Sequence, residues 1–245
     1  MQHRQFTDFD QEIWRSATVE RFGEGKQRTT ALGTIQPFAQ TYRRGHGFKR
    51  YLEDDPMVTV LFEGVAAKVR STQDGRRRIV GFLLPGEASG LPGPDADTSN
   101  YDLMALDHCR AACMTRDELA VLEERDPSVT RYLTFTMQHQ LHMLQDILVL
   151  GTGRRTEDRL LVLLTNIHQR LRRSNRAEPL SMDVPMRQID FADALGVTSV
   201  HMSRAFAQLR DRGVEATRNG QYLRVRFPDT MEAAAGLQPV LQAAE

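Results

Sequence analysis

Residues 185–213, PMRQIDFADALGVTSVHMSRAFAQLRDRG, carry the pattern of a helix-turn-helix. A first helix is predicted over Arg187–Leu195. It should end at Gly196, because glycine easily adopts the positive φ that a tight interhelical turn needs. Thr198 is a good N-cap for a second helix, which is predicted to continue to Arg212. Two helices joined in this way predict a DNA-binding unit.

Both predicted helices have a buried face and an exposed face. Ile189 lies outside the apolar stripe of the first helix, and Val197 fills the corner between the helices. The predicted buried residues follow helical spacing and are Phe191, Ala192, Leu195, Met202, Ala205, Phe206 and Leu209.

The outer face of the second helix is short or polar near its N-terminal end, where a major-groove helix meets base edges. It presents Ser199, Val200, Ser203 and Arg204, with Arg210 further along. Arg204 has the geometry to bind O6 and N7 of a guanine. An ordinary helical hairpin with a solvated outer face remains the alternative on spacing alone.

A β-hairpin is predicted directly after the second helix. Strand-like segments Val214–Thr217 and Tyr222–Phe227 flank Arg218-Asn219-Gly220-Gln221, and Asn-Gly favours a tight turn. Arg218 would lie near the tip of this hairpin, where it suits a phosphate contact. A helix-turn-helix followed by a hairpin is the winged form.

The segment from Tyr42 to Met114 predicts short strands separated by turns. An apolar run at Met57–Phe62 is followed by Val65–Thr72 and Ile79–Leu84, with Gln73-Asp74-Gly75 as a hairpin turn. Pro85-Gly86-Glu87 and Leu91–Asp97 mark further turns. This pattern predicts an antiparallel sandwich or barrel.

A long helix is predicted from Asp126, as N-cap, to Leu150, with Pro127 in the first turn. Its apolar positions alternate spacings of four and three at Met137, Leu141, Leu144 and Leu148, and Tyr132, Leu133, Phe135 and Ile147 widen the apolar surface. The helix either packs on its own domain or forms a two-stranded coiled coil with a second chain. Spacing alone leaves both open.

Gly151-Thr152-Gly153 predicts a hinge after this helix. Thr156 can cap the next helix, whose first turn carries Glu157 and Asp158 in favourable positions for the helix dipole. The apolar stripe of that helix is Leu160, Leu161, Leu164, Ile167, His168 and Leu171.

Composition is that of a globular protein, with 245 residues, 40% hydrophobic and 26% charged. The net charge is zero, but from Arg154 onward fourteen basic and eleven acidic residues give +3, and every basic residue there is arginine. Neither a long apolar run nor a signal-peptide core is present, so a cytoplasmic location without membrane contact is expected. Nothing in the residue spacing suggests an enzyme.

The two cysteines, Cys109 and Cys113, lie in a predicted strand from Ala105 to Met114. Four residues along a strand span about 13 Å, whereas a disulfide needs about 5.5 Å between Cα atoms. We therefore expect two small buried residues on one face of the strand and no disulfide.

The chain resembles the Crp/Fnr superfamily of bacterial transcription regulators over nearly its whole length. The resemblance is carried by Asp74-Gly75-Arg76-Arg77-Arg78-Ile79, Leu83-Leu84-Pro85-Gly86-Glu87, Gly153-Arg154-Arg155-Thr156-Glu157-Asp158-Arg159-Leu160, and Asp190-Phe191-Ala192-Asp193-Ala194-Leu195-Gly196-Val197-Thr198 with Ser203-Arg204.

The resemblance implies an α+β fold with an N-terminal antiparallel β-roll (a double-stranded β-helix), a long dimerisation helix and a C-terminal winged helix-turn-helix domain. The expected boundaries are 1–125, 126–153 and 154–245. It also favours the coiled coil, in which Met137, Leu141, Leu144 and Leu148 would form the dimer contact. Double-stranded DNA, a second copy of the chain and RNA polymerase are the implied partners.

Carried over by position, Ser199, Val200 and Arg204 occupy the family's base-reading positions, and Gln188, Thr198 and His201 its phosphate-contacting ones. Val200 stands where the family often has a glutamate, so contact with a thymine methyl replaces pairing with cytosine. Arg187 replaces the usual Ser or Thr cap of the first helix and gains a possible phosphate contact.

No cofactor is predicted. Members that bind cyclic AMP carry a Gly-Glu pair and a later Arg-Ser or Arg-Thr pair, but this chain has Gly90-Leu91 and Ser99-Asn100-Tyr101, so cyclic AMP is not expected. Two cysteines cannot hold the family's four-cysteine iron–sulfur cluster. No spacing among His46, His108, His139 and His142 singles out a haem ligand, and redox control through Cys109 or Cys113 would need an exposed, low-pKa thiol.

The predicted function is a homodimeric, sequence-specific regulator on a pseudo-palindromic operator. The alternative is a ligand-sensing or protein-interaction module with a degenerate DNA-binding domain, which the zero net charge and the missing glutamate at Val200 favour. Salt dependence of DNA binding discriminates the two.

Overall fold

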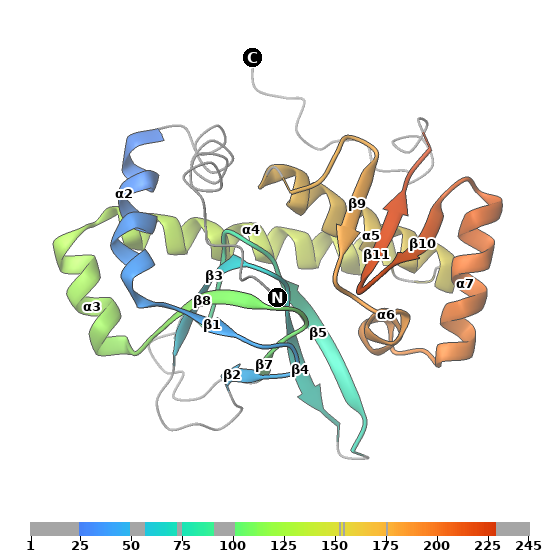
Figure 1. The fold of residues 1–245 in the computed structure, drawn as a ribbon, viewed down its shortest axis with the longest axis horizontal. Helices are drawn as coiled ribbons and strands as arrows, with labels where there is room; N and C mark the ends of the chain where they lie inside the picture. Colours follow the sequence, from blue (N-terminus) through green and yellow to red (C-terminus); the bar gives the residue numbers. More distant parts are fainter. Residues whose placement is uncertain are drawn as a thin grey trace.

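The computed structural model describes residues 25–49, 57–72, 75–90, 101–151, 153, 155–174 and 176–228. The predicted turn Leu91–Asp97, the pair Ser99-Asn100 and the predicted turn residues Gln73 and Asp74 lie outside these ranges. Within them the chain forms a β-roll, one long helix and a winged helix, arranged along the long axis of the molecule (Figure 1). The predicted fold class is confirmed.

Two four-stranded antiparallel sheets build the β-roll. The first has the order β1-β8-β3-β6, with β1 Ala39–Tyr42, β8 Cys109–Met114, β3 Val58–Glu63 and β6 Glu87–Ser89. The second has the order β2-β7-β4-β5, with β2 Gly47–Lys49, β7 Asp102–Ala105, β4 Ala66–Ser71 and β5 Arg77–Leu83. The predicted hairpin between β4 and β5 is confirmed, since Ser71 pairs with Arg77.

The predicted single strand from Ala105 to Met114 is wrong. β7 ends at Ala105, a bend covers 106–108, and β8 begins at Cys109 in the other sheet. The bend transfers the chain between sheets, and the Leu106 amide donates to the Val65 carbonyl there (2.8 Å). The sequence of this run gives no signal that the chain passes from one sheet to the other, because β7 and β8 both carry buried apolar residues.

The two cysteines are free and face the same core, but only Cys109 is buried, whereas both were predicted to be. Cys109 is buried, and burial raises the pKa of its thiol to about 12. Its Sγ donates to the Val65 carbonyl at 3.3 Å. Cys113 is half-buried and accepts a hydrogen bond from the Tyr42 hydroxyl at 3.4 Å. Cys109 is therefore not the exposed, low-pKa thiol that redox control would need.

Two helices beside the β-roll were not predicted, α2 Gly25–Ile35 and α3 Arg116–Arg125; a short 3-10 turn, Gln36–Phe38, follows α2. α3 begins with a capping box: Thr115 Oγ1 accepts from the Glu118 amide, and the Glu118 carboxylate accepts from the Thr115 amide. Asp126 ends α3, and its Oδ1 accepts from the amide and the hydroxyl of Ser128 (3.0 and 2.6 Å). Asp126 thus caps the long helix as predicted.

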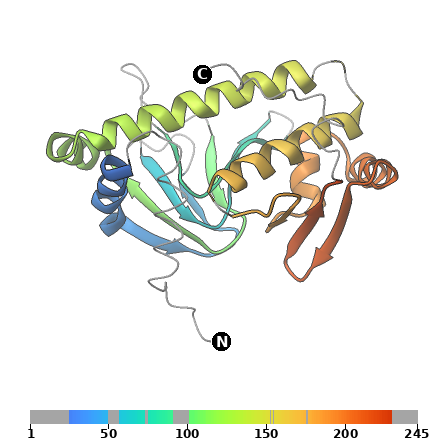
Figure 2. The ribbon, with the colours of Figure 1, turned by 90° about the horizontal axis from the view of Figure 1, so that it is seen from above.

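The long helix α4 runs from Ser128 to Gly151 and flanks both the β-roll and the winged helix (Figure 2). In its first half Val129, Tyr132 and Leu133 are buried against the β-roll, where the Tyr132 hydroxyl donates to the Gly86 carbonyl (3.0 Å). The residues of the predicted seam in its second half are exposed: the exposed fractions are 42% for Met137, 55% for Leu141, 48% for Leu144 and 66% for Leu148.

The winged helix comprises α5 Thr156–Arg173, β9 Ser181–Val184, α6 Gln188–Leu195, α7 Ser199–Asp211, β10 Glu215–Asn219 and β11 Tyr222–Arg226. Its three strands form an antiparallel sheet in the order β10-β11-β9, and β9 was not predicted. The apolar stripe of α5 is buried as predicted.

Across the part of the chain that the structure describes, no helix is both long and apolar enough to cross a membrane.

Two local predictions in this domain are corrected by one residue. Thr156 is the first helical residue of α5 and not its cap, which is Arg155 and makes no side-chain capping bond. In the wing Asn219 pairs with Tyr222, so the turn is Gly220-Gln221, one residue later than Asn219-Gly220. The pairing of β11 with β9 on its other edge helps to fix this register.

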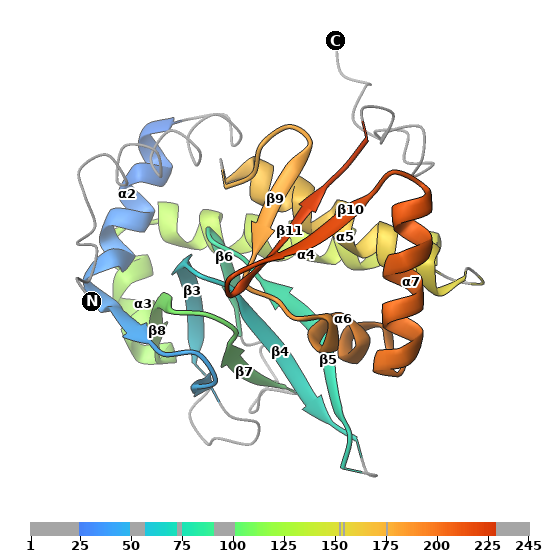
Figure 3. The same cartoon turned by 45° about the vertical axis from the view of Figure 1, so that its right-hand side comes forward.

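One apolar core connects the winged helix to the β-roll. Ile79, Phe82 and Leu84 of the β-roll belong to the same cluster of buried side chains as α5, α6 and α7. The ring centroids of Phe82 and Phe191 are 6.4 Å apart, and α6 lies beside β5 (Figure 3). The two halves are therefore packed together and are not merely tethered.

His168 gives a testable prediction for stability. It is buried on α5, its Nε2 lies 2.9 Å from the Glu178 carbonyl, and burial lowers its pKa below the ordinary value of about 6.5. The unfolded chain therefore takes up this proton at a higher pH than the folded chain. We expect the free energy of unfolding to fall as the pH drops below about 6.5.

Urea unfolding at pH 7.5 and pH 5.5 measures this effect. H168Q should show a weaker pH dependence than the native chain. The control is H108Q, which changes an exposed histidine and should keep the native dependence. An identical pH dependence for H168Q and the native chain contradicts the prediction.

Candidate nucleic-acid interface

The turn between α6 and α7 has the predicted geometry. Gly196 ends α6 with a φ of 70°, and the Val197 amide donates to the Ala192 carbonyl (3.1 Å). A Cβ at Gly196 would come no closer than 4.0 Å to another side chain, so backbone conformation and not space requires glycine there. Arg159 of α5 donates to the Leu195 carbonyl (2.8 Å) and so binds the end of α6.

α7 begins at the predicted cap. Thr198 Oγ1 accepts from the His201 amide (3.3 Å) and lies 2.9 Å from His201 Nδ1. The predicted buried residues of α6 and α7 are buried. Phe191 and Phe206 make an edge-to-face contact with centroids 5.8 Å apart, which fixes the two helices against each other.

The outer face of α7 is open to solvent. Ser199, Val200, Ser203 and Arg204 are all exposed, and the exposed fraction of Val200 is 58%. Ser203 donates to Gln188 Oε1 at 3.2 Å, so the start of α6 and the outer side of α7 share one surface. We call this the α7 surface; it consists of Gln188, Thr198, Ser199, Val200, His201, Ser203 and Arg204.

Arg187 lies at the edge of the α7 surface and is held by an acid. Arginine has no hydrogen-bond acceptor, so it cannot cap α6 with its side chain. Instead Asp190 Oδ2 accepts from the Arg187 amide (2.8 Å) and lies 3.5 Å from Arg187 Nε. Asp190 is fully buried, whereas Arg187 is exposed. Sequence reasoning missed this role of Asp190, although an acid at the third helical position is its signal.

Arg218 lies apart from α7, on the wing. It is exposed, and its Nε donates to the Gly220 carbonyl (3.3 Å). The wing tip rests on the β-roll, where the Tyr222 hydroxyl donates to Asp107 Oδ2 (3.0 Å). Arg218 therefore belongs to the same domain as the α7 surface but is not part of that surface.

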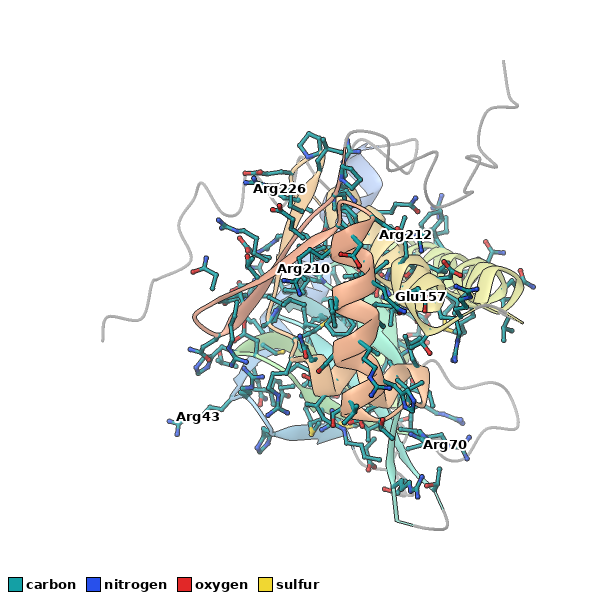
Figure 4. All side chains as sticks on the ribbon, turned by 90° about the vertical axis from the view of Figure 1, so that its right-hand side faces the viewer. Arg43, Arg70, Glu157, Arg210, Arg212 and Arg226 are labelled. Atoms are coloured by element: carbon teal, nitrogen blue, oxygen red, sulfur yellow. The ribbon has the colours of Figure 1, made fainter. Side chains whose placement is uncertain are left out.

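Several arginines lie on the side of the molecule that Figure 4 presents, together with the acid Glu157. Arg210, Arg212 and Arg226 come from the winged helix, and Arg43 and Arg70 come from the β-roll. Arg212 pairs with Asp158 at 2.7 Å. Guanidinium groups suit phosphate because they offer planar, bidentate donors.

The described residues contain no group of three His, Cys, Asp or Glu side chains that could hold a metal ion. His46 and His108 are exposed, and the side chains of His139 and His142 lie outside the described part. The chemistry that the site offers is hydrogen bonding and charge. It suits recognition of an anionic polymer.

A family comparison and two sequence relatives point to the same class of protein. Residues 158–234 match the Crp-like helix-turn-helix domain family. The chain is 30% identical over 205 residues to the transcriptional activatory protein AadR of Rhodopseudomonas palustris, covering 82% of this chain and 83% of AadR. It is also 30% identical over 164 residues to the transcriptional activator FnrL of Cereibacter sphaeroides, covering 65% of this chain and 64% of FnrL, just under two thirds of that relative.

Among solved structures, FixK2 from Bradyrhizobium japonicum is similar, with a TM-score of 0.65 and 24% identity over 80% of this chain and 95% of that one. At this identity the likeness is one of fold.

The cap at Thr198 gives a prediction for the stability of the site. T198A removes the acceptor for the His201 amide and should lower the free energy of unfolding by about 1 kcal/mol. The control is S199A at the next position, which is exposed and should leave stability unchanged. Equal stabilities of T198A and S199A in urea unfolding would show that the cap is energetically silent.

Proposed function

We propose a function from this premise: the chain belongs to the Crp/Fnr superfamily of bacterial transcription regulators. As a Crp/Fnr-type regulator it binds DNA and is not an enzyme. The proposed finer function is that of a homodimer on a pseudo-palindromic operator, with one α7 in each of two major grooves about 34 Å apart. The observation that carries it is the exposed α7 surface on a helix whose opposite face is buried.

In the proposed complex Arg204 binds a guanine through O6 and N7. Ser199 and Ser203 are short enough to let the helix approach the bases, and the exposed Val200 contacts a thymine methyl. Gln188, Thr198, His201, Arg187 and Arg218 contact phosphates.

The proposed dimer contact is the seam of α4. Its residues are exposed at coiled-coil spacing, and burial against a second copy would remove this apolar surface from water: Met137, Leu141, Leu144 and Leu148. The proposed division of the chain is a sensor-like β-roll (1–125), a dimerisation helix and hinge (126–153) and a DNA-binding domain (154–245). RNA polymerase is the proposed further partner, in the cytoplasm, and no cofactor is required.

Arg204 tests the base-reading assignment. R204A should weaken binding to the selected operator by about 1–3 kcal/mol per half-site and leave binding to scrambled DNA nearly unchanged, because the lost contact is to a base and not to a phosphate. Gel-shift titration measures both affinities. The control is Q208A, one turn further along the exposed side of α7, which should bind like the native protein.

Equal losses on the operator and on scrambled DNA would contradict the role of Arg204. A binding constant independent of salt would instead favour the alternative of a ligand-sensing or interaction module, since phosphate contacts release counterions.

The seam of α4 gives a prediction for assembly. L141E together with L148E places like charges along the proposed dimer contact and should yield monomers, because charged side chains would be buried unpaired. Sedimentation equilibrium measures the mass. The control is V121E on α3, where an apolar side chain of similar exposure (45%) lies at the other end of the molecule. Dimers of L141E/L148E as stable as the native ones would place the contact elsewhere.

A further inference from the structure

Two arginines form ion pairs that cross from the β-roll to the winged helix of the same chain, and one of them, Arg77, pairs with Asp193 (3.4 Å) as well as with Asp190. Arg170 on α5 donates from Nε to Glu87 Oε1 (2.8 Å) and from Nη2 to the Phe82 carbonyl (2.7 Å). Arg77 on β5 donates from Nη2 to Asp190 Oδ1 on α6 (3.2 Å). We call Arg170–Glu87 and Arg77–Asp190 the interdomain ion pairs.

The Arg170–Glu87 pair is sheltered from water, whereas in the Arg77–Asp190 pair only the acid is buried. The exposed side-chain fractions are 8% for Arg170, 11% for Glu87, 0% for Asp190 and 32% for Arg77. A buried ion pair contributes little net stability, but an arrangement that separated its partners would leave charges buried and unpaired. The planar guanidinium also binds a carboxylate in a fixed direction. The interdomain ion pairs therefore select one orientation of the winged helix among those that the apolar core alone would permit.

The Arg77–Asp190 pair is connected to the α7 surface by hydrogen bonds at the start of α6. Asp190 binds Arg77 through one oxygen and the Arg187 amide through the other, at the start of α6. The next residue, Gln188, accepts from Ser203 on α7. A shift of Asp190 relative to the β-roll therefore moves the α7 surface as well.

Further contacts lead from the β-roll to the proposed dimer helix. On α4, Gln140 donates to the Ala88 carbonyl (2.6 Å) and accepts from Lys68 Nζ (2.8 Å). The β-roll is thus bound on one side to α4 and on the other to α6. In a dimer formed through α4, the interdomain ion pairs set the distance and angle of each α7 from the two-fold axis.

We propose that Arg77 and Arg170 are positioning residues that set the half-site spacing the dimer recognises, without contacting DNA. This inference rests on the proposed function, because spacing has meaning only for a dimer on a two-part site. Such a dimer requires the spacing of its recognition helices to match that of the half-sites. Released winged helices would occupy the matching arrangement only part of the time, and affinity falls by that fraction.

The test is a gel-shift series on the operator selected by the native protein, on versions with one or two base pairs inserted between the half-sites, and on a single half-site. Each inserted base pair moves a half-site by about 3.4 Å and turns it by about 35°. R77Q should bind the native spacing about tenfold more weakly than the native protein does, with a flatter preference among spacings and unchanged binding to the single half-site.

The matched control is R110Q, which breaks an ion pair inside the β-roll, Arg110–Glu63 (2.9 Å), with side chains 22% and 33% exposed. R110Q should keep the native spacing preference. The double variant E87Q/R170Q removes both charges of the more buried pair together, so it leaves no unpaired charge, and it should flatten the preference as R77Q does. If circular dichroism shows that R77Q is unfolded, the double variant provides the test in its place.

A native spacing preference in folded R77Q and in E87Q/R170Q overturns the inference and leaves the proposed function intact. Absence of any spacing preference in the native protein instead counts against the proposed dimer on a two-part site.

Discussion

The packing of Phe191 between the β-roll and α7 is the contact on which the rest of the structure depends. Phe191 is fully buried, with Phe82 of β5 on one side and Phe206 of α7 on the other. This apolar contact brings the two halves of the chain together, but apolar contacts are not directional. The polar contacts around it supply direction: Arg77 with Asp190, Arg170 with Glu87, and Tyr222 with Asp107.

Similar contacts engage acidic side chains elsewhere in this chain of zero net charge. Several carboxylates of the described part are engaged by arginines within the molecule, including Glu87, Asp190, Asp158 and Asp183. Glu87 and Asp190 are buried, so their charge is taken up inside the fold. Arg204 on α7 and Arg218 on the wing are exposed to solvent. Net charge was therefore a poor guide to the partner.

Sequence reasoning predicted the helix-turn-helix well because its signals are local: helical spacing, the glycine at 196 and the cap at Thr198. It could have predicted α3 as well, since Thr115 and Glu118 form a capping box. The break between β7 and β8 and the register of the wing depend on pairing with strands distant in sequence. The interdomain ion pairs join residues 83 and 113 positions apart, so nothing in the local pattern of arginines and acids singles them out.

The most direct measurement of the central claim is selection of bound sequences from a random DNA pool by the full-length protein. An inverted repeat is expected, with half-sites one helical turn apart, about 34 Å, because two identical α7 surfaces related by a two-fold axis would meet successive major grooves. Guanine should be enriched where Arg204 meets the bases. Recovery of an unpaired half-site, or of no enriched sequence at all, would contradict the claim that a symmetric dimer presents α7 to DNA.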